Sequence, residues 1–253
     1  MISSHTLQNI SNENGIDKYS ILREIIQISF LEELYRLPVS KRIYFKGGTA
    51  LKILFASNRY SEDLDFTTDL NSSGIDDAIN TVVNQLNKEY PEITTKDIDT
   101  IAGISKKITL PVEISSQPLT IKLDFSQRES VIGPRSGTIF TKLPVTTSSV
   151  IQHLSDEEIL AEKYRAVINR VKGRDLYDFL FLLKRGVKFN HNLVNEKLKY
   201  YNEVYNPNDF IHKVEKWDEK ELDEDIRRFL PLKERGVVSE IKNILLDRFN
   251  EIK

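Results

Sequence analysis

A glycine pair that follows a short β-like run is the first feature of the chain that could do chemistry. Lys46, Gly47, Gly48 and Thr49 stand in succession, and the apolar pattern of residues 49–55 predicts a helix directly after the glycines. The start of a helix exposes backbone N–H groups at its positive end, which binds phosphate. Glycines there let a triphosphate approach the main chain closely. The motif predicts a phosphate cradle, and the alternative is a simple turn.

Two aspartates, which follow the glycine motif after thirteen residues, supply carboxylates at strand spacing. Asp63 and Asp65 alternate with apolar residues, so a strand would place both carboxylates on one face. A third acid, Asp124, alternates with apolar residues in the run 119–126. Hard oxygen ligands suit Mg²⁺, which proteins hold with one or two carboxylates plus substrate phosphates. We therefore expect a two-Mg²⁺ site, the alternative being plain polar strand edges.

A lysine in the second half of the chain lies where an apolar side chain is expected. On a helical wheel, Lys163 falls inside an apolar arc that comprises Ile159, Leu160, Tyr164, Val167, Ile168 and Val171. Its ammonium would contact triphosphate oxygens, where it offsets charge that develops in the transition state. The alternative is a lysine whose methylenes cross the edge of the core toward water.

Two acids follow in the next predicted helix, residues 174–184. Asp175 suits the first turn of a helix on dipole grounds alone. Asp178 needs a partner, because the residues after it are apolar on all sides and predict a buried helix. Lys163, Arg174 or an incoming hydroxyl could be that partner. We expect both acids to orient Lys163 or the acceptor.

The charge is distributed unevenly. The whole chain has a net charge of −2, yet residues 163–188 carry eight basic residues against two acids. A basic stretch in an acidic protein suggests a local phosphate site, and the alternative is a solvated helix face. Arg174 lies in this stretch and is a candidate for nucleotide binding. Arg59 and Ser61, close to the aspartates, are further candidates that could equally stabilise a turn.

The elements that must position these residues fall into two groups. Helices are predicted over 20–37 and 76–90, and alternation with Pro and Gly between 92 and 128 predicts a strand-rich segment. Beyond a capping box at 155–158 the pattern is helical, and Gly173 is expected to end the first helix. The predicted domains are an α/β lobe with a mixed sheet, residues 1–150, and a helical lobe, residues 151–253.

Composition excludes several protein classes. The chain has no Cys, which excludes a disulfide scaffold and a thiolate metal site. The four His show no ligand spacing, and near-zero net charge argues against a general nucleic-acid coating protein. No apolar run suggests a membrane span, and the first 20 residues lack signal-peptide features. We therefore expect a cytoplasmic protein without membrane partners.

The order of glycine pair, helix and Asp-x-Asp strand resembles the DNA polymerase β-like nucleotidyltransferase superfamily. FKGGTALKILFASNRYSEDLDF, residues 45–66, is similar to the KGGTAL…RxSxDLDF block of AbiEii/AbiGii-type nucleotidyltransferase toxins. EEILAEKYRAVINRVKGRDLYDFLFLL, residues 157–183, resembles the second block of that family, a helical EK…A followed by RDxxD. Thr49 stands where many members of the wider superfamily have Ser, which keeps a hydroxyl.

The resemblance implies a nucleotidyltransferase fold whose helical lobe closes on the nucleotide. It also implies an RNA acceptor, the 3′ end of tRNA, and an antitoxin encoded alongside. In the reaction we expect, a nucleoside monophosphate moves from NTP to the acceptor and pyrophosphate is released. The candidate phosphate-binding residues in the first lobe are Lys46, Gly47, Gly48, Thr49, Arg59 and Ser61.

Two other classes of function remain open. One is a metal-dependent nuclease, because acid clusters with Mg²⁺ also cleave phosphodiesters. An NTP-cradling Gly-Gly-Thr motif argues against it. The other is a non-catalytic nucleotide-binding regulatory protein, which the intact Asp63, Asp65 and Lys163 disfavour.

Overall fold

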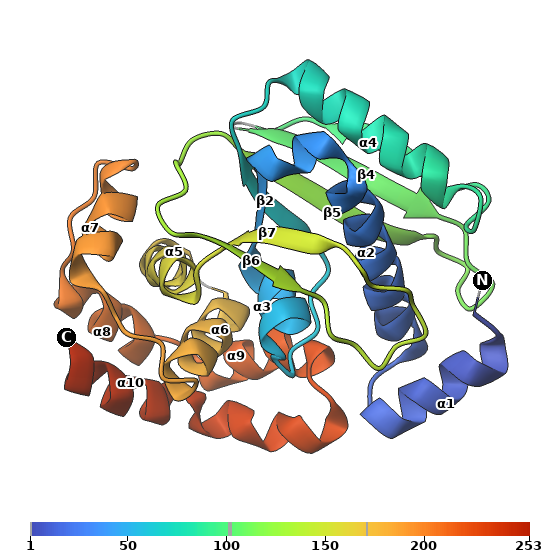
Figure 1. The fold of residues 1–253 in the computed structure, drawn as a ribbon. Coiled ribbons are helices and arrows are strands. Elements are labelled where there is room, and N and C mark those ends of the chain that lie inside the picture. The colour runs from blue at the N-terminus through green and yellow to red at the C-terminus, as the bar shows by residue number, and fades with distance from the viewer. Residues whose placement is uncertain (1, 101–102, 171) are drawn as a thin grey trace. The chain divides into compact units, whose positions relative to one another are not determined.

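The computed structural model describes residues 2–100, 103–170 and 172–253. The chain divides into two compact units, Met1–Leu154 and Ser155–Lys253. The first unit combines helices with a sheet, and the second is built from helices (Figure 1). The predicted α/β class with a mixed sheet and a helical C-terminal half is confirmed. None of the described helices offers an apolar stretch long enough to span a bilayer.

A seven-stranded mixed sheet forms the centre of the first unit, in the order β3-β4-β5-β2-β1-β7-β6. β2 runs parallel to β5 and β1 runs parallel to β7, while the other neighbouring strands are antiparallel. The strands are β1 (Ile43–Lys46), β2 (Leu64–Thr68), β3 (Thr94–Ile98), β4 (Ile104–Leu110), β5 (Leu119–Ser126), β6 (Pro134–Thr138) and β7 (Val150–Leu154).

The two faces of the sheet differ in polarity. Along β5 buried and half-buried residues alternate, so Leu123 belongs to the core whereas Asp124 faces the other way. Helices α2 and α4 pack against each other over the apolar face, and their side chains share one hydrophobic cluster with Leu64. The polar face is therefore the one that presents the predicted acids. The helices of this unit are α1 (Ser4–Asn14), α2 (Lys18–Arg36), the 3₁₀ helix η1 (Pro38–Arg42), α3 (Gly47–Phe55) and α4 (Ser72–Leu86).

Two element boundaries differ from the prediction in a way that matters for the site. Helix α3 begins at Gly47, so the glycine pair forms its first turn and does not merely precede it. Strand β2 begins at Leu64, so Asp63 lies just before the strand. Of the two acids, only Asp65 thus lies within β2, and Asp63 lies in the segment that enters the strand.

Helices of the second unit pack around aromatic rings. Phe210 and Phe249 stack with ring centroids 4.1 Å apart, and Phe179 lies 4.8 Å from Phe210. Tyr164 stacks on Phe210 at 5.5 Å, which ties α5 to α8. The helices are α5 (Asp156–Asn169), α6 (Gly173–Lys184), α7 (His191–Lys199), α8 (Pro207–Glu215), α9 (Glu219–Ile226), the 3₁₀ helices η2 (Arg227–Phe229) and η3 (Leu232–Glu240), and α10 (Ile241–Ile252).

The start of α5 agrees with the sequence pattern, whereas the role of Gly173 does not. The hydroxyl of Ser155 accepts a hydrogen bond from the backbone N–H of Glu158 at 3.1 Å, as the capping box predicts. The prediction that Gly173 ends α5 is wrong, because Gly173 is the first residue of α6. A Cβ at this position would lie 2.7 Å from a methyl group of Leu222, so a side chain here would displace Leu222 of α9. Val171 lies outside the described residues.

Candidate active site

The turn between β1 and α3 brings a glycine against a carboxylate. Gly47 has φ +78°, a backbone conformation that L side chains rarely adopt. A Cβ on Gly47 would lie 2.2 Å from Oδ2 of Asp65, so a side chain would occupy the place of the carboxylate. Lys46 is buried and pairs with Asp65 in the register of β1 and β2. The structure thus sets the N-terminus of α3 directly beside one of the predicted metal ligands.

The second glycine lies beneath two further predicted residues. A Cβ on Gly48 would lie 2.2 Å from Nη2 of Arg59 and 3.0 Å from Oγ of Ser61. Arg59 is only 2% exposed, and its Nη1 donates a hydrogen bond to the Tyr60 carbonyl at 2.9 Å. A guanidinium, a hydroxyl and the first amides of α3 therefore lie together. These are the donors that a phosphate group would need.

Thr49 has a more local function than the sequence indicates. Its side chain is buried, and the hydroxyl donates a hydrogen bond to the main-chain carbonyl of Asp63. This bond ties the first turn of α3 to the segment that enters β2. Thr49 thereby fixes the backbone of Asp63, and its hydroxyl has a protein partner.

The third predicted acid is in register with the second. Asp65 and Asp124 are Cα partners on the parallel strands β2 and β5, so their side chains project from the same face. Asp124 pairs with Nζ of Lys122 at 2.7 Å and accepts a hydrogen bond from the hydroxyl of Ser105. Asp63, just ahead of β2, lines a hollow together with Lys122.

These acids suit a metal that also binds phosphate. Within residues 2–100, 103–170 and 172–253, no group of three or more His, Asp or Glu side chains is arranged to enclose a metal ion. A protein-only cage is not what Mg²⁺ requires, because one or two carboxylates plus substrate phosphates complete its shell. The carboxylate of Asp65 packs against Gly47, where a Cβ would collide with it, so this ligand lies beside the first turn of α3. Asp65, with Asp124 in register beside it, thus fits such an ion.

Lys163 lies in a buried ion-pair network on α5 and α6. Its Nζ is 3.0 Å from Oδ1 of Asp175 and 2.7 Å from Oδ2 of Asp178. The Lys163 side chain is 10% exposed, and both carboxylate side chains are fully buried. The ammonium is therefore held by the two acids, and does not extend along the core edge into open water. Lys163 is thus the partner that buried Asp178 requires.

Arg170 is a member of this network that the sequence analysis missed. Its Nε lies 2.7 Å from Oδ2 of Asp175, and its Nη2 donates to Oδ1 at 3.0 Å. Burial alone would raise the pKa of Asp175, but Lys163 and Arg170 outweigh it and hold that pKa well below its usual range. Arg174 contributes its backbone N–H to Asp225 at 3.4 Å. The basic stretch gave a signal for Arg170, but its partner depends on the turn between two helices.

A second buried ion pair lies on the same helix. Nζ of Lys197, on α7, is 2.6 Å from Oε1 of Glu158 and 3.1 Å from Oε1 of Glu162. Lys197 is 1% exposed and Glu158 is fully buried. Nothing in the local sequence distinguishes Lys197 from a surface lysine, since its burial depends on how α7 packs on α5.

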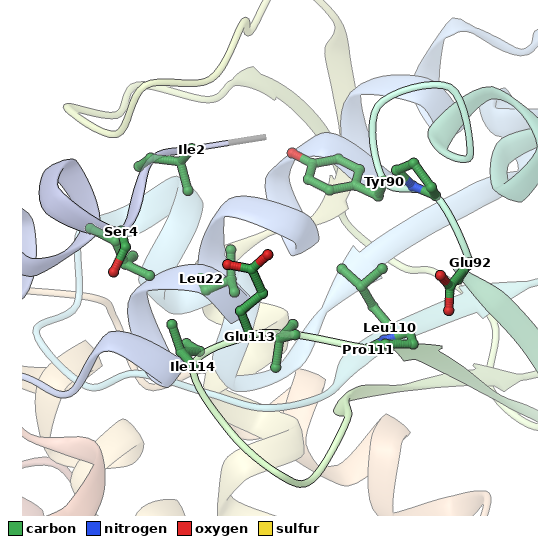
Figure 2. Close-up of a pocket in the computed structure, with 12 residues that line it drawn as sticks. Ile2, Ser4, Leu22, Tyr90, Glu92, Leu110, Pro111, Glu113 and Ile114 are labelled. Carbon is green, nitrogen blue, oxygen red and sulfur yellow. The ribbon is translucent and has the colours of Figure 1, made fainter.

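A separate cavity of about 450 Å³ in the first unit contains none of the predicted residues (Figure 2). Its lining is mostly aliphatic, with the ring of Tyr90 and the acids Glu92 and Glu113. Burial raises the pKa of Tyr90 to about 12. Its described lining residues include no lysine or arginine, so the cavity is unsuited to phosphate.

Comparison with known proteins identifies the family to which the chain belongs. The family described as nucleotidyl transferase AbiEii toxin, Type IV TA system, matches residues 29–244. No curated protein matches the chain.

Two solved structures share the fold. MenT4, the nucleotidyltransferase toxin Rv2826c from Mycobacterium tuberculosis H37Rv, has a TM-score of 0.64 at 17% identity, over 98% of this chain and 90% of its own. JHP933 from Helicobacter pylori has a TM-score of 0.56 at 20% identity, over 93% of this chain and 95% of its own. The family match covers most of both units, and the protein is thus a nucleotidyltransferase that belongs to the AbiEii family of toxins from toxin–antitoxin systems.

Proposed function

We propose that this nucleotidyltransferase moves a nucleoside monophosphate from NTP to RNA, with the 3′ end of tRNA as acceptor and Mg²⁺ as the metal. The observation that supports this proposal best is the contact between the Gly47 turn and Asp65. It unites two requirements of the reaction, a helix N-terminus for phosphate and a carboxylate for the metal that phosphate carries.

In the proposed reaction, the oxygen of an acceptor hydroxyl attacks the α-phosphorus of NTP. The bond from that phosphorus to the oxygen bridging to the β-phosphate breaks, pyrophosphate leaves, and the hydroxyl proton passes to solvent or a nearby base. Asp63, Asp65 and Asp124 would hold Mg²⁺. The bound ions would neutralise phosphate charge and lower the pKa of the attacking hydroxyl.

The first unit would bind the β- and γ-phosphates through donors at the start of α3. Gly47 and Gly48 carry no side chain of their own, and Arg59 and Ser61 add a guanidinium and a hydroxyl beside Gly48. Lys46 would add a positive charge. Thr49 would act through the segment that it holds at Asp63.

For Lys163 we propose contact with a phosphate oxygen of the nucleotide. Asp175 and Asp178 position its ammonium. Arg170 also pairs with Asp175, so the negative charge of Asp175 is divided between Arg170 and Lys163. The two acids therefore neutralise only part of the positive charge of Lys163 and Arg170. Arg174 would contact the nucleotide from the same stretch.

The acceptor assignment rests on family membership and charge. The AbiEii family implies an antitoxin partner and an NTP substrate. Eight basic residues against two acids in residues 163–188 agree with a polyanionic acceptor. Since NTP and tRNA meet in the cytoplasm, we propose that the protein acts there.

Incubation of the purified protein with each of four labelled NTPs, Mg²⁺ and unfractionated tRNA tests the proposal. Transfer of label to tRNA, lost on addition of a chelator and restored by Mg²⁺, is the expected result. Cleaved tRNA without label would indicate a nuclease, and unchanged tRNA with bound NTP would indicate a regulatory protein. Either outcome contradicts the proposal.

A further inference from the structure

Three lysines form a row across neighbouring strands on the polar face of the sheet. Lys96 of β3 is the Cα partner of Lys107 of β4, and Lys107 is the Cα partner of Lys122 of β5. Residues paired in this way project from the same face with Cβ atoms about 5 Å apart. Like charges directly opposite each other destabilise a sheet. The row therefore needs a reason other than stability of the fold.

The lysine on the other face of the same strands is neutralised. Lys106, adjacent to Lys107 in β4, has Nζ 2.6 Å from both Asp76 and Asp97. In the described part of the chain, neither Lys96 nor Lys107 pairs with a carboxylate. The polar face thus presents positive charge that the protein does not compensate, apart from the Lys122 pair with Asp124.

The lysine row (Lys96, Lys107 and Lys122) is continuous with the candidate metal site. A hollow of about 170 Å³ is lined by both Lys107 and Lys122 and by Asp63. Arg23 and Glu62 also line it, and Nη1 of Arg23 lies 2.8 Å from Oε1 of Glu62. Nε of Arg23 has no hydrogen-bond partner among the described residues. The open Nε and the two lysines therefore offer donors to an anion on the lysine side of the hollow, opposite the carboxylates of Glu62 and Asp63.

We propose that the lysine row binds the phosphate backbone of the nucleic-acid acceptor and leads it to the carboxylates. This inference rests on the proposed function, since it names the surface that carries the acceptor of that reaction. Two strand spacings separate Lys96 from Lys122, about 9.5 Å. Measured along the axis of a nucleic-acid helix, that span corresponds to about three nucleotide steps of one strand at 3.4 Å of rise each. Threonine hydroxyls flank the row at Thr94, Thr109 and Thr120 and can donate to phosphate oxygens.

An acidic protein is the other polyanion that such a row could bind. The narrow row favours nucleic acid, because its cations are evenly spaced in one line and the flanking side chains are small and hydroxylated. An interface with a folded protein would be expected to have an apolar centre. The neighbours of Lys107 on this face of β4 are Ser105 and Thr109, which are both hydroxylated, and Ile98 is the apolar residue in the lining of the hollow.

The test compares Lys96→Gln/Lys107→Gln with a matched pair, Lys41→Gln/Lys88→Gln. Both variants lose two positive charges from exposed or half-exposed lysines of the first unit. Binding of unfractionated tRNA without Mg²⁺ is measured by fluorescence anisotropy between 50 and 300 mM salt. Each lost phosphate contact lowers the slope of log K against log salt by about 0.7–0.9. For the two contacts that the row variant loses, we expect the slope of log K against log salt to decrease in magnitude by about 1.4–1.8. At 0.15 M salt this corresponds to an affinity for tRNA that is about 10- to 30-fold weaker than that of the wild type.

Four results would overturn the assignment. The row variant could bind tRNA like the wild type or like the Lys41/Lys88 control, or the wild-type protein could fail to bind tRNA. The row variant could instead lose affinity for a non-hydrolysable NTP, which would assign the row to the nucleotide. It could also lose affinity for the purified cognate antitoxin while it keeps tRNA, which would assign the row to an acidic protein. Lys96→Arg/Lys107→Arg should keep tRNA binding, because charge and not lysine shape is required.

Failure of the surface and failure of the proposed reaction give different results. If the wild type transfers label to tRNA and the row variant binds tRNA normally, the reaction stands and the surface is wrong. If the row variant selectively loses tRNA but the wild type transfers nothing, the surface stands and the reaction is wrong.

Discussion

Replacing Lys163 by Met should destabilise the protein by an amount that the ion-pair geometry sets. The change removes an ammonium that lies 3.0 Å from Asp175 and 2.7 Å from Asp178, whose side chains are fully buried. Removing one partner of a buried ion pair lowers the free energy of unfolding by about 3–5 kcal/mol, because the other charge is left buried without compensation. A chain of this length loses about 2–4 °C of Tm per kcal/mol. The expected decrease in Tm is therefore about 6–20 °C.

A double variant separates this stability effect from chemistry. Lys163→Met/Asp178→Asn also removes one buried negative charge, so it should recover at least half of the lost Tm. Transfer should not recover, because the contact with phosphate is still absent. A charge-assisted hydrogen bond of about 1.5–3 kcal/mol corresponds to about a 10- to 150-fold loss in rate. Single-turnover transfer from labelled NTP, measured at a temperature where every variant is folded, checks this loss.

Lys197→Met is the matched control for the same unit. It removes the ammonium that lies 2.6 Å from buried Glu158 and should lower the Tm comparably. Its transfer rate per folded molecule should stay within a few-fold of wild type. A Lys163→Met protein that melts within 2 °C of wild type would refute the argument from buried charge. Recovery of both Tm and transfer in the double variant would refute the role of Lys163 toward phosphate.

Three further perturbations test other parts of the site. Loss of a residue that only supports a metal ligand typically reduces activity by about 10- to 100-fold. Asp65→Asn removes a proposed ligand itself, so it should reduce transfer by more than about 100-fold. Near-normal turnover at saturating Mg²⁺ would contradict this. Gly48→Val should weaken NTP binding at least about tenfold, because its Cβ would lie 2.2 Å from a guanidinium nitrogen of Arg59. Gly236→Val is the control, since no atom lies within 4 Å of its Cβ, and it should bind NTP normally. Titration calorimetry compares the two variants. The depressed pKa of Asp175 means that its ionised form stabilises the fold above about pH 4 and that this contribution is lost as pH falls toward the folded-state pKa. Arg170→Gln should raise that pKa and move the midpoint of acid unfolding, followed by circular dichroism, to higher pH; an unchanged midpoint would show that Arg170 does not act on Asp175.

The sequence predicted the parts of the site that depend on local pattern. Alternation of apolar residues gave β5 with its bounds, and the glycine pair gave the start of α3 within two residues. The helical wheel singled out Lys163 because a charge within an apolar arc is anomalous wherever the helix packs. The acids Asp175 and Asp178 could be linked to Lys163 as candidates, since all three lie in adjoining helices.

Contacts that depend on long-range pairing were beyond the sequence. Strands β6 and β7 were not predicted, because β6 contains Pro and Gly and gains its place only by pairing with β7. The lysine row arises from the register of β3, β4 and β5, which no single strand encodes. From the sequence alone, Lys163→Met would be expected to fold as well as wild type. Only the depth of Asp175 and Asp178 reveals the cost.

The carboxylate of Asp65 beside Gly47 has a consequence for which form of a nucleotide can bind. Negative charge at a helix N-terminus is stabilising, so Asp65 already compensates the positive end of α3. A bare triphosphate would meet that carboxylate at close range and be repelled. A triphosphate that arrives as its divalent-metal complex instead brings the cation that the carboxylate attracts. In the proposed reaction the turn would therefore discriminate against uncomplexed nucleotides before any chemistry begins. By reciprocity of linkage, divalent cation and nucleotide would each tighten the binding of the other by the same factor.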